Sequence, residues 1–326
     1  MASPNLSAAV TATFEDIASD LHDNVMNNNA LLAELNKAGR IEKVSGGRFL
    51  RHNLTYAENG TYTRYQGSQT VNISQNEILS AAQYPLRYVS VAVSMDGQEE
   101  AENGGEAELI SLVETKVENA KTTFMNNMSI DVYSDGTASG GLQVGGLQSI
   151  IAKSPATGTV GGINAANYTF WRNGAYDGSG DLTGDNSATN IQGHMTTVYT
   201  SRIRNGDRPD LIVADTNLWT LFHNSLIADV RHVNKERNQA GTGFPELDFM
   251  GKPVVLDGGL GGACPTDTMY FINTKHLKLK VHKDRSFKPI GGERRSVNQD
   301  AYVILNLWAG NLCCGNRELQ AVLYDA

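Results

Sequence analysis

MDGQEEAENGGEAELISLVETKVENAKTTFMNNMSIDVY, residues 95–133, joins an acidic, glycine-containing lead to the pattern of one long amphipathic helix. No proline interrupts the run, and Gly104 and Gly105 precede it. About 25 helical residues make a rod of roughly 38 Å. We expect this rod to be a spine to which the other elements attach. Its apolar positions recur at the helical period: Leu109, Val113, Val117, Ala120, Phe124 and Met128.

The composition indicates a chain large enough for two domains or one elaborated domain. Of its 326 residues, 40% are hydrophobic and 19% charged, and the net charge is −8, which argues against a cationic nucleic-acid-binding protein. No apolar run reaches the roughly 20 residues of a membrane span, and the N-terminus lacks a signal peptide's basic and apolar regions. With three cysteines, too few for a disulfide framework, we expect a soluble protein from a reducing compartment.

The first 39 residues have the pattern of an arm. One helical face is formed by Phe14, Ile17, Leu21 and Val25, and a second short helix, Ala30–Ala38, ends at Gly39. Two short helices bury little surface by themselves, so we expect the arm to dock elsewhere. A helical cap on the chain's own domain is the alternative.

Residues 46–75 change to the period of a strand. Leu50, Leu54 and Tyr56 alternate, and Tyr65, Val71 and Ile73 do so less regularly, with Asn59-Gly60 between the two runs. This pattern predicts a hairpin roughly 40 Å long. An isolated ribbon is marginal in water, so it must lie on a neighbour. Residues 84–94 then predict a strand that leads to the spine.

Beyond Tyr133 the pattern is a mixture of helices and strands. We expect a helix at Asn190–Arg204, a buried strand at Asp210–Asp215 and a second helix capped by Thr216. Further strands are expected at Val254–Leu256, Tyr270–Ile272, Leu277–Val281, Tyr302–Trp308 and Leu319–Leu323.

Motifs that carry catalysis or bind cofactors are absent from the sequence. It has no phosphate-binding loop, nucleophile elbow or zinc motif. Asp177, Asp181 and Asp185 suggest a calcium loop, but Leu182 and Ala188 stand where glycine and glutamate belong. A hydrolase that uses Asp177 or Asp181 would lack a partner at a defensible spacing. We expect no enzyme, cofactor or metal.

Opposite charges gather in two segments. Lys275–Arg295 holds eight basic residues, whereas Asp96–Glu108 holds six carboxylates and no base. We expect these segments to face one another, within one chain or between two copies, through the pairing residues Glu99, Glu100, Glu102, Lys278, Lys280 and Lys283. The vicinal Cys313 and Cys314 are expected to be buried thiols.

The order of these elements resembles the major capsid proteins of tailed bacteriophages of the Hong Kong 97 type. The resemblance covers essentially the whole chain and lies in an ordered set of segments. These are GLQSIIA at 146–152, TVGGINAANYTFWRN at 159–173, PDLIVADTNLW at 209–219, LDFMGKPVVLDG at 247–258, MYFINTKHLKLKVHKDRSF at 269–287 and AGNLCCGNRELQAVLYDA at 309–326.

The resemblance implies an α+β fold with an N-arm at 1–43 and an extended loop at 44–78. Residues 79–132 and 268–300 would form a peripheral domain with the spine, and 133–267 with 301–326 an axial domain. The extended loop would contact a neighbouring subunit through Arg48, Leu50, Arg51, Leu54, Tyr56, Arg64 and Tyr65. The arm would contact another through Phe14, Ile17, Leu21 and Val25.

The implied function is a virion shell, assembled from hexamers and pentamers in the host bacterial cytoplasm, around double-stranded DNA that it does not bind sequence-specifically. The implied partners are a separate scaffold protein, a portal and a decoration protein, and no membrane. An encapsulin-like nanocompartment shell is the alternative. Some similar proteins join subunits by an isopeptide bond from a lysine on the extended loop. Here no lysine lies between Lys43 and Lys116, so we expect no such bond.

Overall fold

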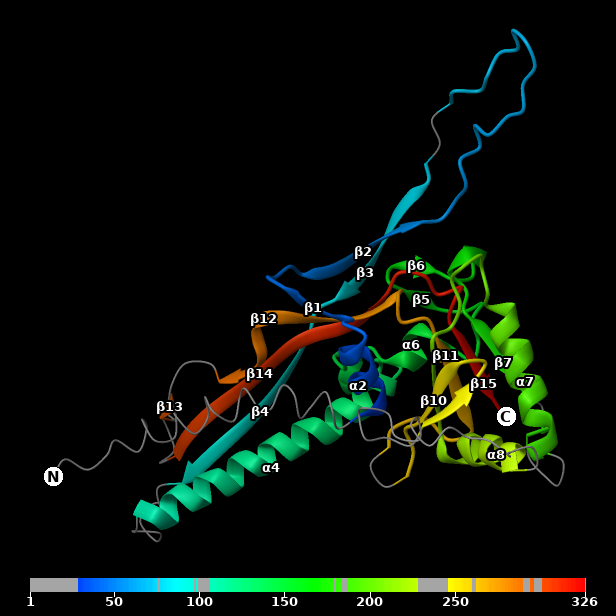
Figure 1. Ribbon diagram of the computed structural model, residues 1–326. Coiled ribbons are helices and arrows are strands. Elements are labelled where there is room, and N and C mark those ends of the chain that lie inside the picture. The colour runs from blue at the N-terminus through cyan, green and yellow to red at the C-terminus, as the bar shows by residue number, and fades with distance from the viewer. Residues whose placement is uncertain are drawn as a thin grey trace.

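A computed structural model of the chain describes residues 29–74, 77–96, 98, 106–178, 180–182, 187–227, 246–259, 262–289, 294–295 and 301–325. Two sheets, a long helix and a projecting loop organise this part of the chain (Figure 1).

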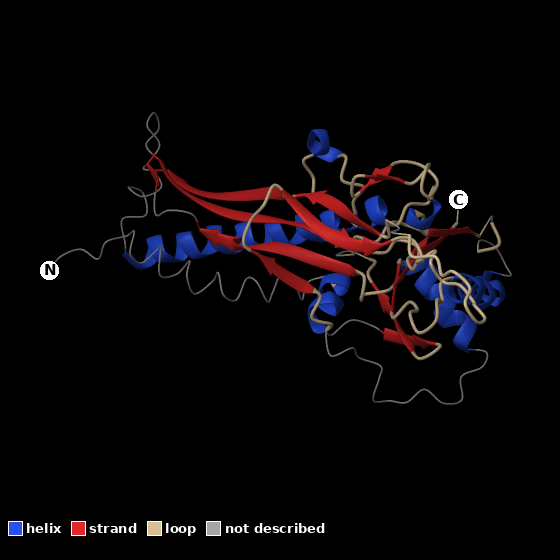
Figure 2. Cartoon of the chain, turned by 90° about the horizontal axis from the view of Figure 1, so that it is seen from above, coloured by secondary structure: helices blue, strands red, loops and turns tan. Residues whose placement is uncertain are grey.

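The predicted spine is confirmed as α4 (Glu106–Tyr133), a helix of 28 residues. Its buried stripe is Val117, Ala120, Phe124 and Met128. The Phe124 ring lies 4.4 Å from that of Phe287, centroid to centroid. Figures 1 and 2 show α4 running alongside the long strands of the first sheet. The helix is amphipathic because one side packs on that sheet.

The first sheet has β14 (Ala301–Cys314) at its centre. On one edge β14 pairs with β4 (Arg87–Asp96). On the other it pairs with β12 (Leu277–Pro289) and β13 (Arg294–Arg295). The parallel strand β1 (Ile41–Val44) completes the sheet beyond β12.

The helix α2 (Ala30–Lys37) belongs to the core of its own chain, contrary to the expectation that this part of the arm docks elsewhere. Ala30, Leu31, Leu32 and Leu35 are fully buried. The Asn29 side chain caps the helix by accepting a hydrogen bond from the Leu32 amide at 3.2 Å. The arm helix expected around Phe14, Ile17, Leu21 and Val25 lies outside the described residues.

The second sheet has six strands and carries the helices α7 (Ser187–Ser201) and α8 (Thr216–Ile227), both near the predicted positions. Its central strand, β8 (Leu211–Ala214), is buried at every residue, as its continuous apolar run predicts. The α8 cap is Asp215, whose carboxylate accepts from the Asn217 amide at 3.3 Å, and not Thr216 as predicted. The strand order is β7 (Gly174–Asp177), β15 (Ala321–Tyr324), β11 (Thr268–Ile272), β8 (Leu211–Ala214), β10 (Lys252–Leu256) and β9 (Glu246–Phe249).

The expected hairpin exists, but its second strand was predicted wrongly. Strand β2 (Phe49–Thr55) pairs with β3 (Leu79–Pro85), and not with residues 65–75. Asn59-Gly60 lies within a long loop without regular structure, and the strand after β3 begins at Arg87. Short elements follow the spine: α5 (Ala138–Gly141), α6 (Leu147–Ile150), β5 (Thr159–Val160), β6 (Ile163–Asn164) and a 3-10 turn at Thr169–Trp171. Residues of β5, β6 and the turn pack against the hairpin.

Candidate functional site

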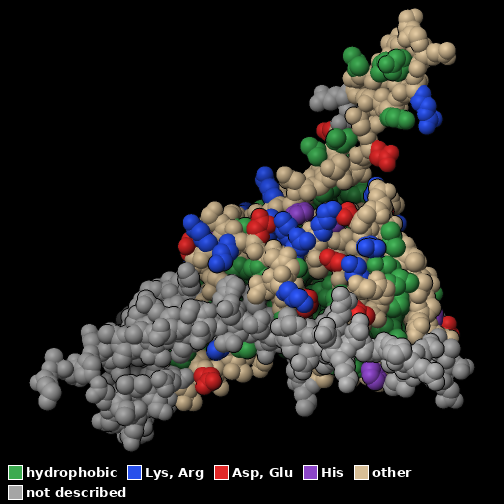
Figure 3. Space-filling model, in the orientation of Figure 1, with side chains coloured by type: hydrophobic (Ala, Val, Ile, Leu, Met, Phe, Trp, Pro, Cys, Tyr) green, Lys and Arg blue, Asp and Glu red, His purple; other side chains and the backbone are tan. Residues whose placement is uncertain are grey.

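The loop between β2 and β3 projects far from the body of the chain (Figure 1). Its apolar side chains are exposed, and Figure 3 shows hydrophobic groups along its length. Ile73 is 91% exposed and Tyr65 is 67% exposed. The other exposed hydrophobics of this region are Tyr62, Val71 and Leu79. These side chains stay exposed within the described chain, and exposed apolar patches are typical of binding surfaces.

The predicted loop contacts differ in their exposure to solvent. Arg48, Arg51, Arg64 and Tyr65 are exposed and free to reach a neighbour. Leu50 and Leu54 are 3% and 8% exposed, buried against their own chain, so their prediction as inter-subunit contacts is wrong. The alternation showed correctly that one face of the strand is buried.

Tyr56 is half-buried, and its ring stacks on Phe170 at 5.4 Å. Tyr62, Val71, Ile73 and Leu79 were not among the predicted contacts. The sequence signal that could have found them is the set of apolar side chains in a segment rich in Thr, Gln and Asn.

The base of the hairpin is fixed by apolar packing and hydrogen bonds. Leu50, Leu54, Ala82 and Tyr84 pack with Trp171 and Cys313, among others. The Tyr84 hydroxyl donates to the Cys314 carbonyl at 3.0 Å, and the Gln83 amide donates to the Gly161 carbonyl at 2.8 Å. The loop therefore projects from a rigid base.

Cys313 and Cys314 are buried free thiols, as predicted, and burial raises the pKa of each to about 12. Protonated thiols in this position act as packing groups and not as nucleophiles.

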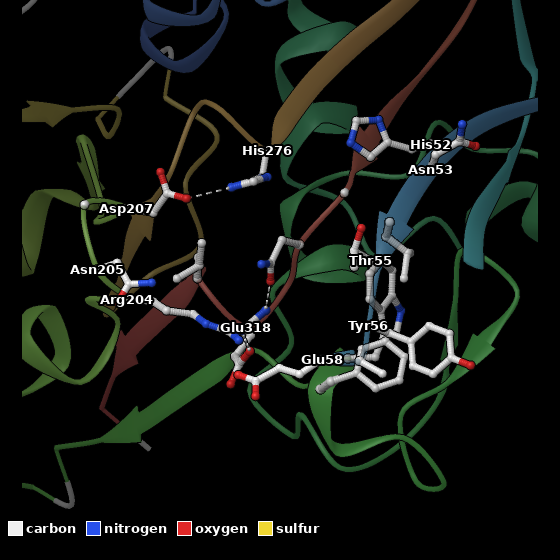
Figure 4. Close-up of a pocket in the computed structure, with 18 residues that line it drawn as sticks. His52, Asn53, Thr55, Tyr56, Glu58, Arg204, Asn205, Asp207, His276 and Glu318 are labelled. Atoms are coloured by element: carbon white, nitrogen blue, oxygen red, sulfur yellow. Dashed lines mark hydrogen bonds and ion pairs between the residues drawn. The ribbon is translucent and has the colours of Figure 1, made fainter. Parts of the chain in front are cut away.

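A pocket of about 600 Å³ lies between β2 and the loops that contain residues 204–207 and 315–319. Asn53, Thr55 and Tyr56 come from one wall, and Asp207 and His276 from the facing wall (Figure 4). The charges here are largely paired within the chain. Arg204 contacts Glu318 at 3.2 Å, and Asp207 contacts Lys275 at 2.7 Å and His276 at 3.7 Å.

The basic segment pairs differently from the expectation. Lys278 and Lys280 lie 3.5 and 3.7 Å from the same carboxylate, that of Glu42 in β1. The Lys280 ammonium also donates to the Arg51 carbonyl at 2.9 Å. These lysines are therefore occupied within their own chain. Lys283 is exposed, and Glu99, Glu100 and Glu102 lie outside the described residues.

A buried carboxylate joins α2 to the end of the spine. The Tyr133 hydroxyl donates to Asp257, which also accepts hydrogen bonds from the backbone of Leu31 and Ala263. Burial raises the pKa of Asp257 to about 6, and these hydrogen bonds oppose the rise. Asp257 thus ties the root of the N-terminal segment to the spine.

Residues that could support catalysis or metal binding do not converge in the described chain. Asp181 and His194 lie 3.7 Å apart, but the Asp181 side chain is 65% exposed, and a lone surface pair is not a catalytic site. No group of three or more potential metal ligands occurs among the described residues. None of the helices in that part of the chain is long and apolar enough to cross a membrane.

Neither a protein-family model nor a curated protein matches the sequence. Solved structures do match. The chain of a cyanophage A-1(L) capsid asymmetric unit has a TM-score of 0.60 at 14% identity, with 88% of this chain and 90% of that chain covered. A Mycobacterium phage Bobi chain has a TM-score of 0.54 at 11% identity and 89% coverage of both chains.

The capsid of an empty GTA particle gives a TM-score of 0.52 at 9% identity, with 89% of both chains covered. The chain has the α+β fold of Hong Kong 97-type phage capsid proteins.

Proposed function

We propose that this protein is the major capsid protein of a tailed bacteriophage, which self-assembles through hexamers and pentamers into an icosahedral shell around double-stranded DNA. The observation that carries the proposal is a loop with exposed apolar side chains, held on a rigid base, in a chain with a capsid fold. The loop exposes Tyr62, Tyr65, Val71 and Ile73 in the isolated subunit. Contacts between copies remove this surface from water, and symmetry repeats them around a closed shell.

The N-terminal arm is the second part of this proposal. Its apolar face, Phe14, Ile17, Leu21 and Val25, would clamp another subunit. The root of the arm is held by α2, which is buried in its own chain, and by the cap at Asn29. Because Asp257 joins α2 to Tyr133 at the end of the spine, the arm would be anchored to the spine. Deletion of residues 1–28 should weaken assembled shells while leaving the folded subunit intact.

The proposed partners follow from the shell. A separate scaffold protein would guide assembly, a portal would occupy one vertex, and a decoration protein could cover the outside. DNA would be enclosed by the shell without being bound tightly to it. A chain of net charge −8 offers few basic side chains that could displace counterions from the DNA phosphates. A steep salt dependence of duplex binding by soluble subunits would contradict this point.

Electron microscopy of the purified chain, with and without its scaffold, tests the proposal. Closed polyhedral shells are expected, and dispersed monomers under all conditions would contradict it. Shells that enclose an enzyme in place of DNA would identify a nanocompartment instead. Assembly is expected in the bacterial cytoplasm, so expression in bacteria should yield particles directly.

A further inference from the structure

The free edge of β2 is an unpaired strand edge beside a pocket. Tyr56 donates its amide to the Ile78 carbonyl, and Leu86 donates to Arg48. Even-numbered residues of β2 therefore turn their backbone groups toward β3. The odd-numbered residues turn theirs outward, and the Arg51 carbonyl is bonded by Lys280. Within the described chain, no hydrogen bond reaches the outward amide or carbonyl of Asn53 or Thr55.

The opposite edge of the ribbon is covered at Gln83 and Pro85. The Gln83 amide donates to the Gly161 carbonyl at 2.8 Å, and the Pro85 carbonyl accepts from the Asn311 side chain at 2.8 Å. On the β2 side, Asn53 and Thr55 line the pocket of about 600 Å³ (Figure 4). An exposed edge is a template for a further strand.

A segment suited to such an edge occurs in the projecting loop. Residues 70–74 read TVNIS, a short stretch with high strand propensity. No hydrogen bond reaches the backbone of Thr70, Val71, Asn72 or Ile73 from any described residue. Val71 and Ile73 are exposed, and in an extended chain they share one face.

The absence of charge and an apolar face make this segment suited to the pocket. Residues 65–74, YQGSQTVNIS, carry no charge. The pocket's Arg204 and Asp207 are already paired with Glu318 and Lys275. An uncharged strand can therefore enter the pocket without leaving a charged side chain buried and unpaired. Its apolar face can pack on the side of the ribbon that carries Tyr56, beside Phe170.

We infer that residues 70–74 of one copy add as a third strand to the free edge of β2 in a second copy, within the pocket beside Asn53 and Thr55. The inference rests on the proposed shell and names the surface that receives the loop. Val71 and Ile73 face Tyr56 and Phe170, so Asn72 lies on the outer face with Thr55.

Cross-linking between two kinds of chain tests the inference. Copies with Thr55→Cys are co-assembled with copies that carry Asn72→Cys, and the shells are oxidised mildly. Neighbouring strands bring Cα atoms within disulfide range. We expect a disulfide-linked dimer band at about twice the chain mass of 35.2 kDa. Shells of either variant alone, which keep the native cysteines, should give no such band.

The matched control replaces Asn72→Cys by Ser68→Cys, an exposed loop position outside the segment. Its dimer band should be at least tenfold weaker. Closed shells with no Thr55–Asn72 band would overturn the inference and leave the proposed function intact. In a further experiment, copies with Ser7→Cys take the place of the copies with Asn72→Cys. A dimer band between Ser7→Cys and Thr55→Cys would assign the β2 edge to the N-terminal segment and would also overturn the inference. Failure of the chain to form shells would contradict both the inference and the proposed function.

A second variant removes one hydrogen bond donor. Asn53→Pro deletes an amide that faces outward and keeps the pairing of β2 with β3, because proline is tolerated at strand edges. We expect the soluble subunit to unfold at the same temperature and to assemble at least tenfold more slowly. Ser68→Pro is the control and should assemble at the original rate. Unchanged assembly of Asn53→Pro would contradict strand addition.

Discussion

Arg317 is fully buried, and its Nη2 donates a hydrogen bond of 3.0 Å to the side-chain oxygen of Asn173. The same guanidinium donates to the carbonyls of Ile150 at 2.6 Å and Trp171 at 3.0 Å. No carboxylate contacts it among the described residues, and burial lowers its pKa. This one side chain joins α6, the turn beneath the hairpin and the last strand region.

Arg317→Leu should therefore destabilise the subunit by about 3–5 kcal/mol, because three buried acceptors lose their donor. Urea unfolding of the soluble subunit measures the change. Arg204→Leu is the control, since its side chain is 60% exposed, and it should cost less than about 1 kcal/mol. Equal losses of unfolding free energy for the two substitutions would show that the hydrogen bonds of the buried Arg317 do not stabilise the subunit more than an exposed ion pair does.

The buried Asp257 predicts that acid stabilises the subunit. Its pKa is about 6 in the folded chain, against an ordinary 3.8, so the folded state binds the proton more tightly. Stability should be greatest when Asp257 is protonated and should fall as the pH rises through 6. The difference amounts to about 3 kcal/mol at most.

Asp257→Asn should remove this part of the pH dependence. Urea unfolding at pH 5 and at pH 7.5 measures the stability of both proteins, and Asp284→Asn, an exposed position, is the control. If the variant gained as much stability on acidification as the original chain, the assignment to Asp257 would be wrong.

Lys278 and Lys280 share Glu42 but should differ in their effect on folding. The Lys280 side chain is 9% exposed and that of Lys278 is 34% exposed. Lys280→Ala leaves the Arg51 carbonyl without its donor and should cost about 1–3 kcal/mol. Lys278→Ala should cost less than about 1 kcal/mol. Thermal unfolding of the two variants compares them, and the reverse order would contradict the burial argument.

The exposed Ile73 should matter for assembly and not for folding. Ile73→Asn leaves the isolated subunit unchanged because the side chain is 91% exposed there. Burial of such a side chain at an interface is worth up to about 3 kcal/mol. We expect the subunit concentration needed for assembly to rise at least tenfold, measured by light scattering. Gln69→Ser is the control, and equal behaviour of the two would exclude Ile73 from the contact.

The shell should contain no covalent bond between subunits through the loop. An isopeptide bond needs a side-chain amine, and the basic side chain of the loop, that of Arg64, carries a guanidinium group in place of an amine. A reducing, denaturing gel of mature particles should show a single band near 35 kDa. A ladder of pentamer- and hexamer-sized species would refute this prediction.

Local periodicity determined much of the fold. The apolar spacing of α4 has the helical period, and the apolar run of β8 is short enough for a buried strand and too short for a typical helix. The alternation of Leu50 and Leu54 indicated a buried face, because a strand turns alternate side chains to one side.

Only the tertiary structure decided which surfaces those faces meet. Leu50 and Leu54 are covered by their own chain, and β2 pairs with residues 79–85, because strand pairing depends on contacts across a long loop that no local pattern encodes. Lys280 meets Glu42 for the same reason: β1 and β12 are parallel neighbours more than two hundred residues apart in sequence. Periodicity fixes which side of an element is buried, whereas packing in three dimensions fixes its partner.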